Sequence, residues 1–312
     1  MLFDPSTLQS LVNDVHARHK DDTGGQNASY IPYLARVPST LCALALMTPD
    51  GKVVAAGDHD YRFAIESISK VPTLALALED VGADAVQQKI GANPTGMAFN
   101  SVMALELHGG KPQSPLVNAG AMSCASIIDA KDVEDRWRRI LKMQRDLLGA
   151  NVALSAQVNE SEQTTNFHNR AIAWLMYADG TMYADPMEVC DVYTRQCSTL
   201  ITTIELATMA ATLAARGRNP ITGQQVLNGD HVPRVLAEMA MEGLYDSSGD
   251  WAYTVGLPAK SGVGGGIMAV APGKLGIAAF SPPLDGVGNS VRAQKMIGDV
   301  ARALRLNLYD PS

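Results

Sequence analysis

The sequence has no excess of basic residues. Its 312 residues include 25 Lys and Arg against 32 Asp and Glu, so the formal net charge at pH 7 is −7. The charged residues are spread along the chain and form no basic tail. Because binding to nucleic acid depends on clustered positive charge, nucleic acid is not expected as a partner.

Long hydrophobic runs are also absent. The longest runs, such as LCALALM at 41–47, are far shorter than the roughly 20 apolar residues that a membrane-spanning helix needs. The N-terminus does not show a basic segment followed by an apolar one, as a secretion signal would. We therefore expect a cytoplasmic protein that does not associate with a membrane.

Cysteine and histidine are too sparse to indicate a disulfide framework or a metal site. Four cysteines occur and none forms a CxxC pair, so we expect reduced thiols in apolar surroundings. His16 and His19 have helical spacing, but no neighbouring residues complete a zinc site, which favours a solvated helix face. No metal site is expected.

The composition is otherwise that of a packed globular protein, with 46% hydrophobic and 18% charged residues. Two apolar runs joined by TPDG at 39–58 predict a β-hairpin. Two more β-rich runs follow residue 256 around the turn APGK, and a helical pattern comes after them. Between these ends, apolar residues at 3- and 4-residue spacing predict successive helices from about 118 to 217.

Strands at both ends of the chain predict an α+β fold. The simplest arrangement is one antiparallel sheet built from both chain ends and flanked by helices, with a helical domain inserted between them. The expected division is 1–75 with 255–312 for the sheet domain and 76–254 for the helical domain. Because active sites favour such domain junctions, we expect the site between the two.

The segment ESISK at 66–70 places Ser67 and Lys70 three residues apart where a helix is predicted to begin. At this spacing two side chains share a helix face, so an amine with a lowered pKa can act as a base for the hydroxyl. Ser67 also suits a helix cap, and Pro72 fits only the first helical turn. Composition predicts about 0.6 chance matches to Ser-x-x-Lys, so the motif alone favours a cap with a solvated Lys70.

A second motif, AKSGVGGGI at 259–267, places Lys260, Ser261 and Gly262 at the edge of a predicted strand. A Lys-Ser/Thr-Gly strand beside Ser-x-x-Lys occurs in serine enzymes that transfer acyl groups. Glycines let a backbone approach a ligand closely, and a strand N–H can join the N–H of Ser67 as a donor in an oxyanion hole. A Gly-rich bulge between strands is the alternative interpretation.

Taken together, six blocks of the sequence resemble the serine-dependent glutaminases. They are ESISK (66–70), SPLVNAGAM (114–122), NESEQTTNFHNRAIA (159–173), DVYTRQCS (191–198), GLYDSSGDWAYTVGLPAKSGVGGGI (243–267) and GIAAFSPPLDGVGNS (276–290). The resemblance covers nearly the whole chain. It implies a β-lactamase/transpeptidase-like fold, hydrolysis of L-glutamine to L-glutamate and ammonia, no cofactor, and a homo-oligomer that is a dimer or tetramer.

The resemblance also implies catalytic roles for single residues. Ser67 would be the nucleophile and Lys70 its base. The backbone N–H groups of Ser67 and Val263 would hold the amide oxygen as it becomes an oxyanion. Tyr245, assisted by Tyr193, would help to transfer a proton to the leaving ammonia, and Lys260 would complete the catalytic group.

A pocket for a free amino acid is implied in the same way. Glu162 would bind the α-ammonium group of the substrate. The other substrate contacts would be hydrogen bonds from Tyr30, Asn118, Asn169 and Tyr193. Taken singly, these residues have plainer interpretations: the asparagines as helix caps, Glu162 as a solvated acid, and the tyrosines, Tyr245 included, as half-buried packing residues.

The sequence departs from the family's usual pattern at four positions. It has Glu66 where Gln is usual, Pro72 where an aromatic residue is usual, His168 where Arg is common, and Gly264 where Ser is common. A carboxylate at position 66 would stabilise the charged form of Lys70 and so raise its pKa. Two alternatives are therefore open: an amidase or esterase of the same fold with a different acyl substrate, or a weakly active relative that binds an amino acid.

Overall fold

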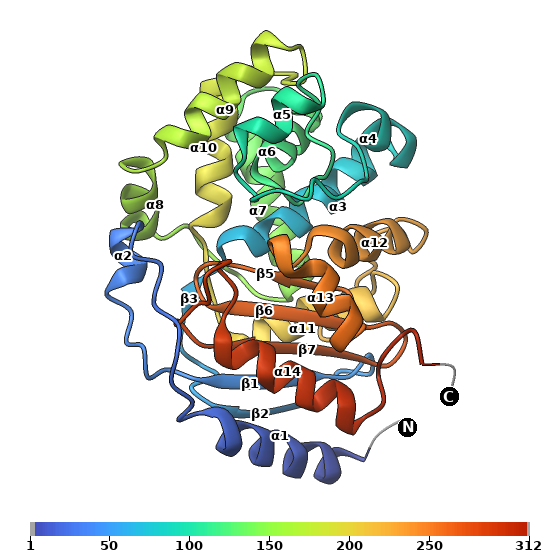
Figure 1. Cartoon of the computed structure of the whole chain (residues 1–312). Helices are drawn as coiled ribbons and strands as arrows, with labels where there is room; N and C mark the ends of the chain where they lie inside the picture. The colour runs from blue at the N-terminus through green and yellow to red at the C-terminus, as the bar shows by residue number, and fades with distance from the viewer. Residues whose placement is uncertain (1–3, 311–312) are drawn as a thin grey trace.

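The computed structural model describes residues 4–310, and a five-stranded antiparallel sheet lies at its centre (Figure 1). The strand order is β2-β1-β7-β6-β5. The strands are β1 (Ala43–Met47), β2 (Val53–Gly57), β5 (Ala259–Ser261), β6 (Gly266–Ala271) and β7 (Leu275–Phe280). Two short strands, β3 (Phe63–Ala64) and β4 (Leu200–Ile201), form a separate pair.

The two ends of the chain meet inside this sheet. β1 pairs antiparallel with β7, so that Ala43 lies opposite Phe280. On its other side β1 pairs with β2 across the predicted TPDG turn. The expected α+β class is therefore confirmed, with one antiparallel sheet built from both chain ends and flanked by helices.

Helices cover both faces of the sheet. Leu44 and Leu46 of β1 join a hydrophobic cluster with residues of α1 (Pro5–His19) and α14 (Val291–Ala303). The alternate residues of β1 join a second cluster with α11 (Thr203–Ala214), because successive side chains of a strand point to opposite faces. Two buried faces explain why the strands are apolar at almost every position.

Most of the remaining helices form a layer above α11 (Figure 1). They are α3 (Lys70–Val81), α4 (Ala83–Lys89), α5 (Val102–Leu107), α6 (Asn118–Ile127), α7 (Val133–Leu148), α8 (Ala156–Gln163), α9 (Phe167–Ala178), α10 (Pro186–Cys197) and α12 (Val232–Glu242), with α2 (Pro32–Ala35) beside α8 and 3₁₀ turns η1 (Glu66–Ser69) and η2 (Tyr245–Ser247). Helix α13 (Ser248–Thr254) instead joins the hydrophobic cluster of α1 and α14 through Trp251. The helices predicted between 118 and 217 are confirmed. The sequence pattern missed α8, which buries only Val158 and so lacks an apolar repeat.

Helix α11 belongs to the expected helical segment in sequence, yet it packs directly against β1, β6 and β7. Gly276 of β7 permits this approach, since a Cβ there would lie 2.2 Å from the backbone nitrogen of Ala211. The division into 1–75 with 255–312 and 76–254 stays a prediction. Helix α11, from the segment 76–254, therefore forms a buried interface with strands of the segments 1–75 and 255–312.

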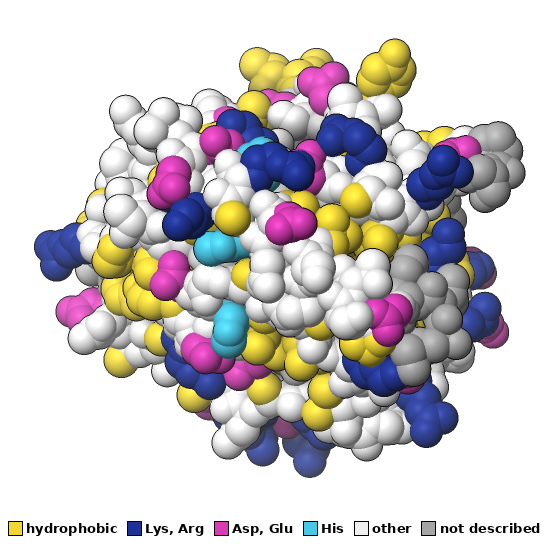
Figure 2. Space-filling view, turned by 90° about the horizontal axis from the view of Figure 1, so that it is seen from below, with side chains coloured by type: hydrophobic (Ala, Val, Ile, Leu, Met, Phe, Trp, Pro, Cys, Tyr) yellow, Lys and Arg dark blue, Asp and Glu magenta, His cyan; other side chains and the backbone are white. Residues whose placement is uncertain are grey.

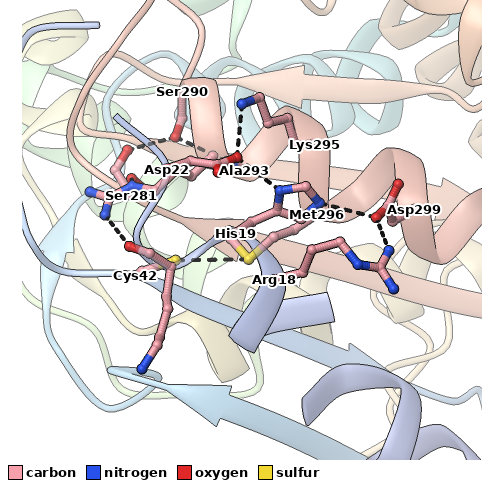
Figure 3. A network of polar contacts seen from close by, with 12 residues as sticks. Arg18, His19, Asp22, Cys42, Ser281, Ser290, Ala293, Lys295, Met296 and Asp299 are labelled. Carbon is pink, nitrogen blue, oxygen red and sulfur yellow. Dashed lines mark hydrogen bonds and ion pairs between the residues drawn. The ribbon is translucent and has the colours of Figure 1, made fainter. Parts of the chain in front are cut away.

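A polar network joins α1 to α14 at the outer face of the sheet (Figure 3). The His19 ring contacts Asp22 through Nδ1 at 2.9 Å and Asp299 through Nε2 at 3.0 Å. Lys295 Nζ donates to Asp22 at 2.8 Å, and Arg18 also contacts Asp299. The predicted solvated helix face is wrong for His19, whose side chain is only 13% exposed, because α14 from the far end of the chain covers it.

Surface charge and cysteine chemistry follow the composition. The face of the molecule seen in Figure 2 carries Lys and Arg side chains interspersed with Asp and Glu. All four cysteines are free and buried, as predicted. Within residues 4–310, none of the helices combines the length and the apolar character needed to cross a membrane.

The contact between β7 and α11 yields a stability prediction. Gly276→Ala should lower the free energy of unfolding by about 1–3 kcal/mol, because the added methyl group forces the helix away from the strand. Gly249→Ala is the matched control, since a Cβ at Gly249 in α13 meets nothing within 4 Å. Urea unfolding of both variants measures the difference, and equal midpoints would contradict the close packing described here.

Candidate active site

The predicted nucleophile lies in η1, directly before α3. Ser67 is 7% exposed, and its hydroxyl accepts a hydrogen bond of 2.9 Å from Lys70 Nζ. The helix-cap interpretation is wrong, because α3 begins at Lys70 and the Ser67 side chain caps no backbone N–H. Pro72 lies in the first turn of α3, as predicted.

Lys70 is buried and bonded to neutral oxygens. Its Nζ atom donates to Ser67 Oγ and, at 2.8 Å, to Asn118 Oδ1. The Nζ atom also lies 5.7 Å from the ring centre of Phe99 and 5.9 Å from that of Tyr193. Burial, which penalises the charged form, lowers the pKa of Lys70 to about 8. The solvated-lysine interpretation is therefore wrong.

Asn118 connects Lys70 to two other predicted residues. Its Oδ1 atom also accepts a hydrogen bond of 3.0 Å from the Tyr193 hydroxyl, and its Nδ2 atom donates to Asn169 Oδ1 at 2.9 Å. Asn118 is the first residue of α6 and makes no capping hydrogen bond, while Asn169 lies inside α9. The helix-cap alternatives are wrong for both, and the four side chains form one hydrogen-bonded group.

Tyr245 reaches the same group from the opposite side. Its hydroxyl donates to Ser261 O at 3.1 Å. Its backbone has a φ of +55°, a left-handed conformation that is unfavourable for a residue with a side chain. The Tyr245 ring packs on Phe99, with ring centres 4.7 Å apart. Tyr245 and Tyr193 are both fully buried, not half-buried packing residues.

Lys260 lies behind Tyr245. Its Nζ atom donates to the backbone oxygens of Gly243 at 3.1 Å and Ser261 at 2.8 Å, and it lies 4.5 Å from the centre of the Tyr245 ring. Its side chain is fully buried, and burial, reinforced by the charge of Lys70, lowers its pKa well below the usual value. Lys260 thus contacts the backbone and Tyr245.

Val263 lies in the tight turn between β5 and β6, which packs against η1. A Cβ at Gly262 would lie 2.8 Å from the backbone oxygen of Ile65, and one at Gly264 would lie 2.2 Å from that of Ala64. Ala64 and Ile65 lie just before Glu66 and the nucleophile in the chain. The glycines therefore let this turn approach the backbone that leads to Ser67. The close approach of this turn to a ligand stays a prediction.

A cavity of about 940 Å³ opens beside these residues. Four of the predicted binding residues line it together, namely Tyr30, Asn118, Glu162 and Asn169. The cavity is also lined by Asn118, which bonds to Lys70, and by Phe99, which packs on Tyr245. The location of the active site at a junction of two domains stays a prediction.

Glu66 is buried next to the nucleophile and interacts with Glu162. Its side chain is 3% exposed, and its backbone φ is +50°. Burial, together with the nearby carboxyl of Glu162, raises the pKa of Glu66 well above its usual value. Glu66 raises the pKa of Lys70, as expected, but burial has the larger effect and the pKa of Lys70 falls overall.

Comparison with known proteins identifies the family. The family model described as Glutaminase matches residues 25–309.

The chain belongs to the glutaminase family.

It is 68% identical over 310 residues to a glutaminase of Bordetella avium (strain 197N), covering 99% of each chain. The solved structure of the probable glutaminase ybaS shares 66% identity with a TM-score of 0.98 and covers 99% of this chain and 100% of that one. A probable glutaminase from Bacillus subtilis, complexed with 6-diazo-5-oxo-L-norleucine, has 30% identity and a TM-score of 0.86, covering 98% and 97%. The predicted enzyme class and fold class are confirmed.

Sequence reasoning missed two features of this glutaminase site. Phe99 lines the cavity, packs on Tyr245 and lies near Lys70, but the loop that carries it has no pattern beyond its Gly and Pro breakers. The contact between Glu66 and Glu162 joins residues far apart in the chain, and only the fold brings them together.

Within residues 4–310 no group of three or more His, Cys, Asp and Glu side chains is placed to hold a metal ion.

Burial of Lys70 should cost this glutaminase stability. Because folding lowers its pKa from 10.5 to about 8, the unfolded chain holds the proton more tightly, and the penalty is present below pH 8 and fades as the pH rises towards 10.5. Lys70→Met should therefore raise the free energy of unfolding at pH 7 by about 1–3 kcal/mol.

Thermal and urea unfolding at pH 7 and pH 10 measure this effect. The gain from Lys70→Met should shrink at pH 10, where the wild-type amine is neutral in the folded protein. Lys20→Met, which removes an exposed lysine, is the control and should change stability by less than about 0.5 kcal/mol. A less stable Lys70→Met variant at pH 7 would contradict the predicted penalty.

Proposed function

We propose that this glutaminase hydrolyses the side-chain amide of L-glutamine to L-glutamate and ammonia through an acyl-enzyme on Ser67. The observation that carries the proposal is the hydrogen bond of 2.9 Å between Lys70 Nζ and Ser67 Oγ beside the cavity. A serine hydroxyl needs a base within hydrogen-bond reach, and a lysine serves as one when burial lowers its pKa. Both conditions are met at this pair.

In the first half of the reaction, neutral Lys70 takes the proton of the Ser67 hydroxyl while the oxygen attacks the amide carbon. The carbonyl oxygen becomes an oxyanion, which the N–H groups of Ser67 and Val263 stabilise; one such donor contributes about 3–4 kcal/mol. The C–N bond then breaks as the nitrogen receives the proton from Lys70 through the Tyr245 hydroxyl, assisted by Tyr193. Ammonia leaves and the glutamyl ester of Ser67 remains.

In the second half, a water molecule replaces ammonia. Its oxygen attacks the ester carbon while Lys70 accepts its proton, and the same two N–H groups hold the new oxyanion. The ester bond breaks, the proton returns to Ser67 Oγ, and L-glutamate is released. The protein ends each cycle with Ser67 and Lys70 in their starting protonation states.

The cavity supplies groups for the two charged ends of an amino acid. Glu162 is assigned to the α-ammonium group, and Tyr30, Asn118, Asn169 and Tyr193 are assigned to the remaining polar contacts. The Bacillus subtilis relative supports this assignment, because 6-diazo-5-oxo-L-norleucine is an α-amino acid with a carbonyl at C5, as L-glutamine is. The acyl group would then point towards Ser67.

Lys260 acts in this scheme as a positioning residue. Its ammonium lies over the Tyr245 ring and holds the carbonyls of Gly243 and Ser261, the second of which also accepts from the Tyr245 hydroxyl. These contacts hold Tyr245 in its left-handed backbone conformation. Lys260 therefore orients the proton donor without touching the substrate.

The family resemblance is the basis for proposing a homo-oligomer, as a dimer or tetramer. The cytoplasmic location expected from the pattern of apolar residues is also proposed. Exposed aromatic side chains on α9, namely Phe167, Trp174 and Tyr177, agree with a surface that a second copy covers. Light scattering of the purified protein measures the oligomer size.

Replacement of Ser67 tests the mechanism. Ser67→Ala should reduce ammonia release from L-glutamine by at least about 10³-fold, because among residues 4–310 Ser67 has the only hydroxyl that accepts a hydrogen bond from Lys70. Incubation with 6-diazo-5-oxo-L-norleucine, which alkylates a nucleophile with loss of dinitrogen, should add one label to the wild type at Ser67 and none to the variant, as read by mass spectrometry.

Ser69→Ala is the matched control, since Ser69 is a buried serine of the same turn whose hydroxyl contacts Cys197. It should keep the label at Ser67. Ammonia release that persists in Ser67→Ala would contradict the nucleophile assignment. Faster hydrolysis of asparagine or of a simple ester than of L-glutamine by the wild type would instead favour another amidase or esterase.

The pKa of Lys70 sets the expected pH dependence. With a pKa of about 8, the neutral base is a minor form at pH 7, so kcat should rise about tenfold per pH unit below pH 8 and level off above it. Lys70→Arg should be inactive throughout, because a guanidinium stays charged. A kcat that does not change between pH 6 and pH 9 would contradict the role of Lys70 as the base.

A further inference from the structure

Helices α3 and α10 are joined by a hydrogen bond close to Lys70. Lys70 begins α3, and Thr73 lies three residues later in the same helix. Thr73 Oγ1 donates a hydrogen bond of 2.8 Å to Oε1 of Gln196, which lies near the end of α10. Neither Thr73 nor Gln196 lines the cavity, so this contact connects one helix to another and reaches no ligand there.

The spacing of the residues places this contact beside the base. Lys70 and Thr73 are three residues apart in α3. Tyr193 and Gln196 are three residues apart in α10, so each pair shares one face of its helix. Asn118 Oδ1 accepts hydrogen bonds from both Lys70 and Tyr193. The two helices are therefore linked twice, about one turn apart.

A third helix holds the backbone of Gln196. Gln144 of α7 donates from Nε2 to Gln196 O at 2.9 Å, and its Oε1 atom accepts from Thr199 Oγ1 at 2.9 Å. Thr199 O in turn accepts from the N–H of Ile65, which directly precedes η1. Because α7 also packs against both α3 and α10, these bonds connect the end of α10 with the segment that leads to the nucleophile.

The polar side chains of this network, Thr73, Gln144, Gln196 and Thr199, are fully buried. A buried polar group is costly when it has no partner, whereas an apolar side chain of the same shape fills a core without that cost. Fully paired polar groups restrict a core to one arrangement, because a shift of either helix breaks a bond. The network therefore fixes how α3 lies against α10.

Ser69 contributes less to the link between the helices. Its backbone oxygen accepts from Thr73 Oγ1 at 3.2 Å, a contact within the first turn of α3. Its hydroxyl accepts from Gln196 Nε2 at 3.4 Å, which is long for a hydrogen bond. The bond of 2.8 Å between Thr73 and Gln196 is the stronger of the two that join α3 and η1 to the Gln196 side chain.

We propose that Thr73 and Gln196 are positioning residues: their hydrogen bond fixes α3 against α10 and so keeps the Lys70 amine within reach of the Ser67 hydroxyl. Neither residue touches the substrate. Proton transfer requires the base and the nucleophile at hydrogen-bond distance, and small displacements of reacting groups have large effects on rate. This inference rests on the proposed function, in which Lys70 is the base.

Removal of the Thr73 hydroxyl tests the inference. Thr73→Val keeps the shape of the side chain but has no donor, so kcat for L-glutamine should fall about tenfold to a hundredfold. KM should stay within about threefold, because Glu162 and Asn169, which are assigned to the substrate, lie on α8 and α9. Thr73→Ser retains the hydroxyl and should keep kcat within about threefold of the wild type.

A double-variant cycle tests whether the two residues act through one bond. Gln196→Met removes the acceptor with a side chain of similar length and should lower kcat as Thr73→Val does. The variant with both changes should be no more than about threefold slower than the slower single variant, since each change removes the same bond. Reductions that multiply in the double variant would contradict a shared role.

Thr212→Val is the matched control. Thr212 is also a fully buried helical threonine, and its hydroxyl donates to Thr208 O at 2.9 Å and Leu147 O at 3.2 Å. Its replacement should lower the urea midpoint as Thr73→Val does, yet keep kcat within about twofold of the wild type. An unchanged kcat in Thr73→Val overturns the inference. So does an equal fall in Thr212→Val or in Thr73→Ser, because either result indicates a general packing role.

The rate of labelling by 6-diazo-5-oxo-L-norleucine separates this inference from the proposed function. The label reports attack by Ser67 and does not need the release of ammonia. Thr73→Val should be labelled about tenfold or more slowly than the wild type, and Thr212→Val at the wild-type rate. Equal rates in all three proteins overturn the inference even if Ser67 is confirmed as the nucleophile. A wild type that takes no label at Ser67 overturns the proposed function, and the inference with it.

Discussion

The chemistry proposed for this protein depends on one buried amine. Lys70 is enclosed by the helical layer and the sheet, and its hydrogen-bond acceptors, Ser67 and Asn118, are neutral. No carboxylate accepts a hydrogen bond from the amine. The cost of burying its positive charge is therefore not offset by an ion pair, and burial lowers the pKa of Lys70. Asn118 orients the amine, and Tyr193 and Asn169 orient Asn118. A change in any of these side chains would therefore alter the position of Asn118 Oδ1, the oxygen that accepts a hydrogen bond from Lys70.

Strained backbone places the reacting groups against this amine. Glu66 and Tyr245 both have left-handed φ values, and each lies in a 3₁₀ turn or at its start. Such conformations persist only when the surroundings hold them. Here the β3–β4 pair holds the first turn, since Ile65 N donates to Thr199 O, and Lys260 holds the second. The β3–β4 pair and β5, which carries Lys260, thus stabilise backbone conformations that are unfavourable for Glu66 and Tyr245.

Sequence patterns predicted the architecture, because strands at both chain ends and the spacing of Ser67 and Lys70 are local features, whereas the pocket residues were proposed from the family resemblance. They failed where contacts depend on burial. Composition favoured a solvated Lys70, yet residues of distant helices enclose it. The catalytic role of Lys260 stays a prediction, and its contacts are with the backbone and with the Tyr245 ring. The electrostatic interaction of Glu66 with Glu162 has no local signature, since Glu162 lies in α8, a helix without an apolar repeat that is far from η1 in the chain.

The pairing of β1 with β7 also has a consequence for biosynthesis. β1 is made long before its partner strand β7. Until β7 is made, β1 has an unpaired edge, a state that favours association with other chains. Contacts between such distant segments also slow folding. The long helical insertion between β2 and β5 thus lengthens the time for which this edge stays unpaired in the nascent chain.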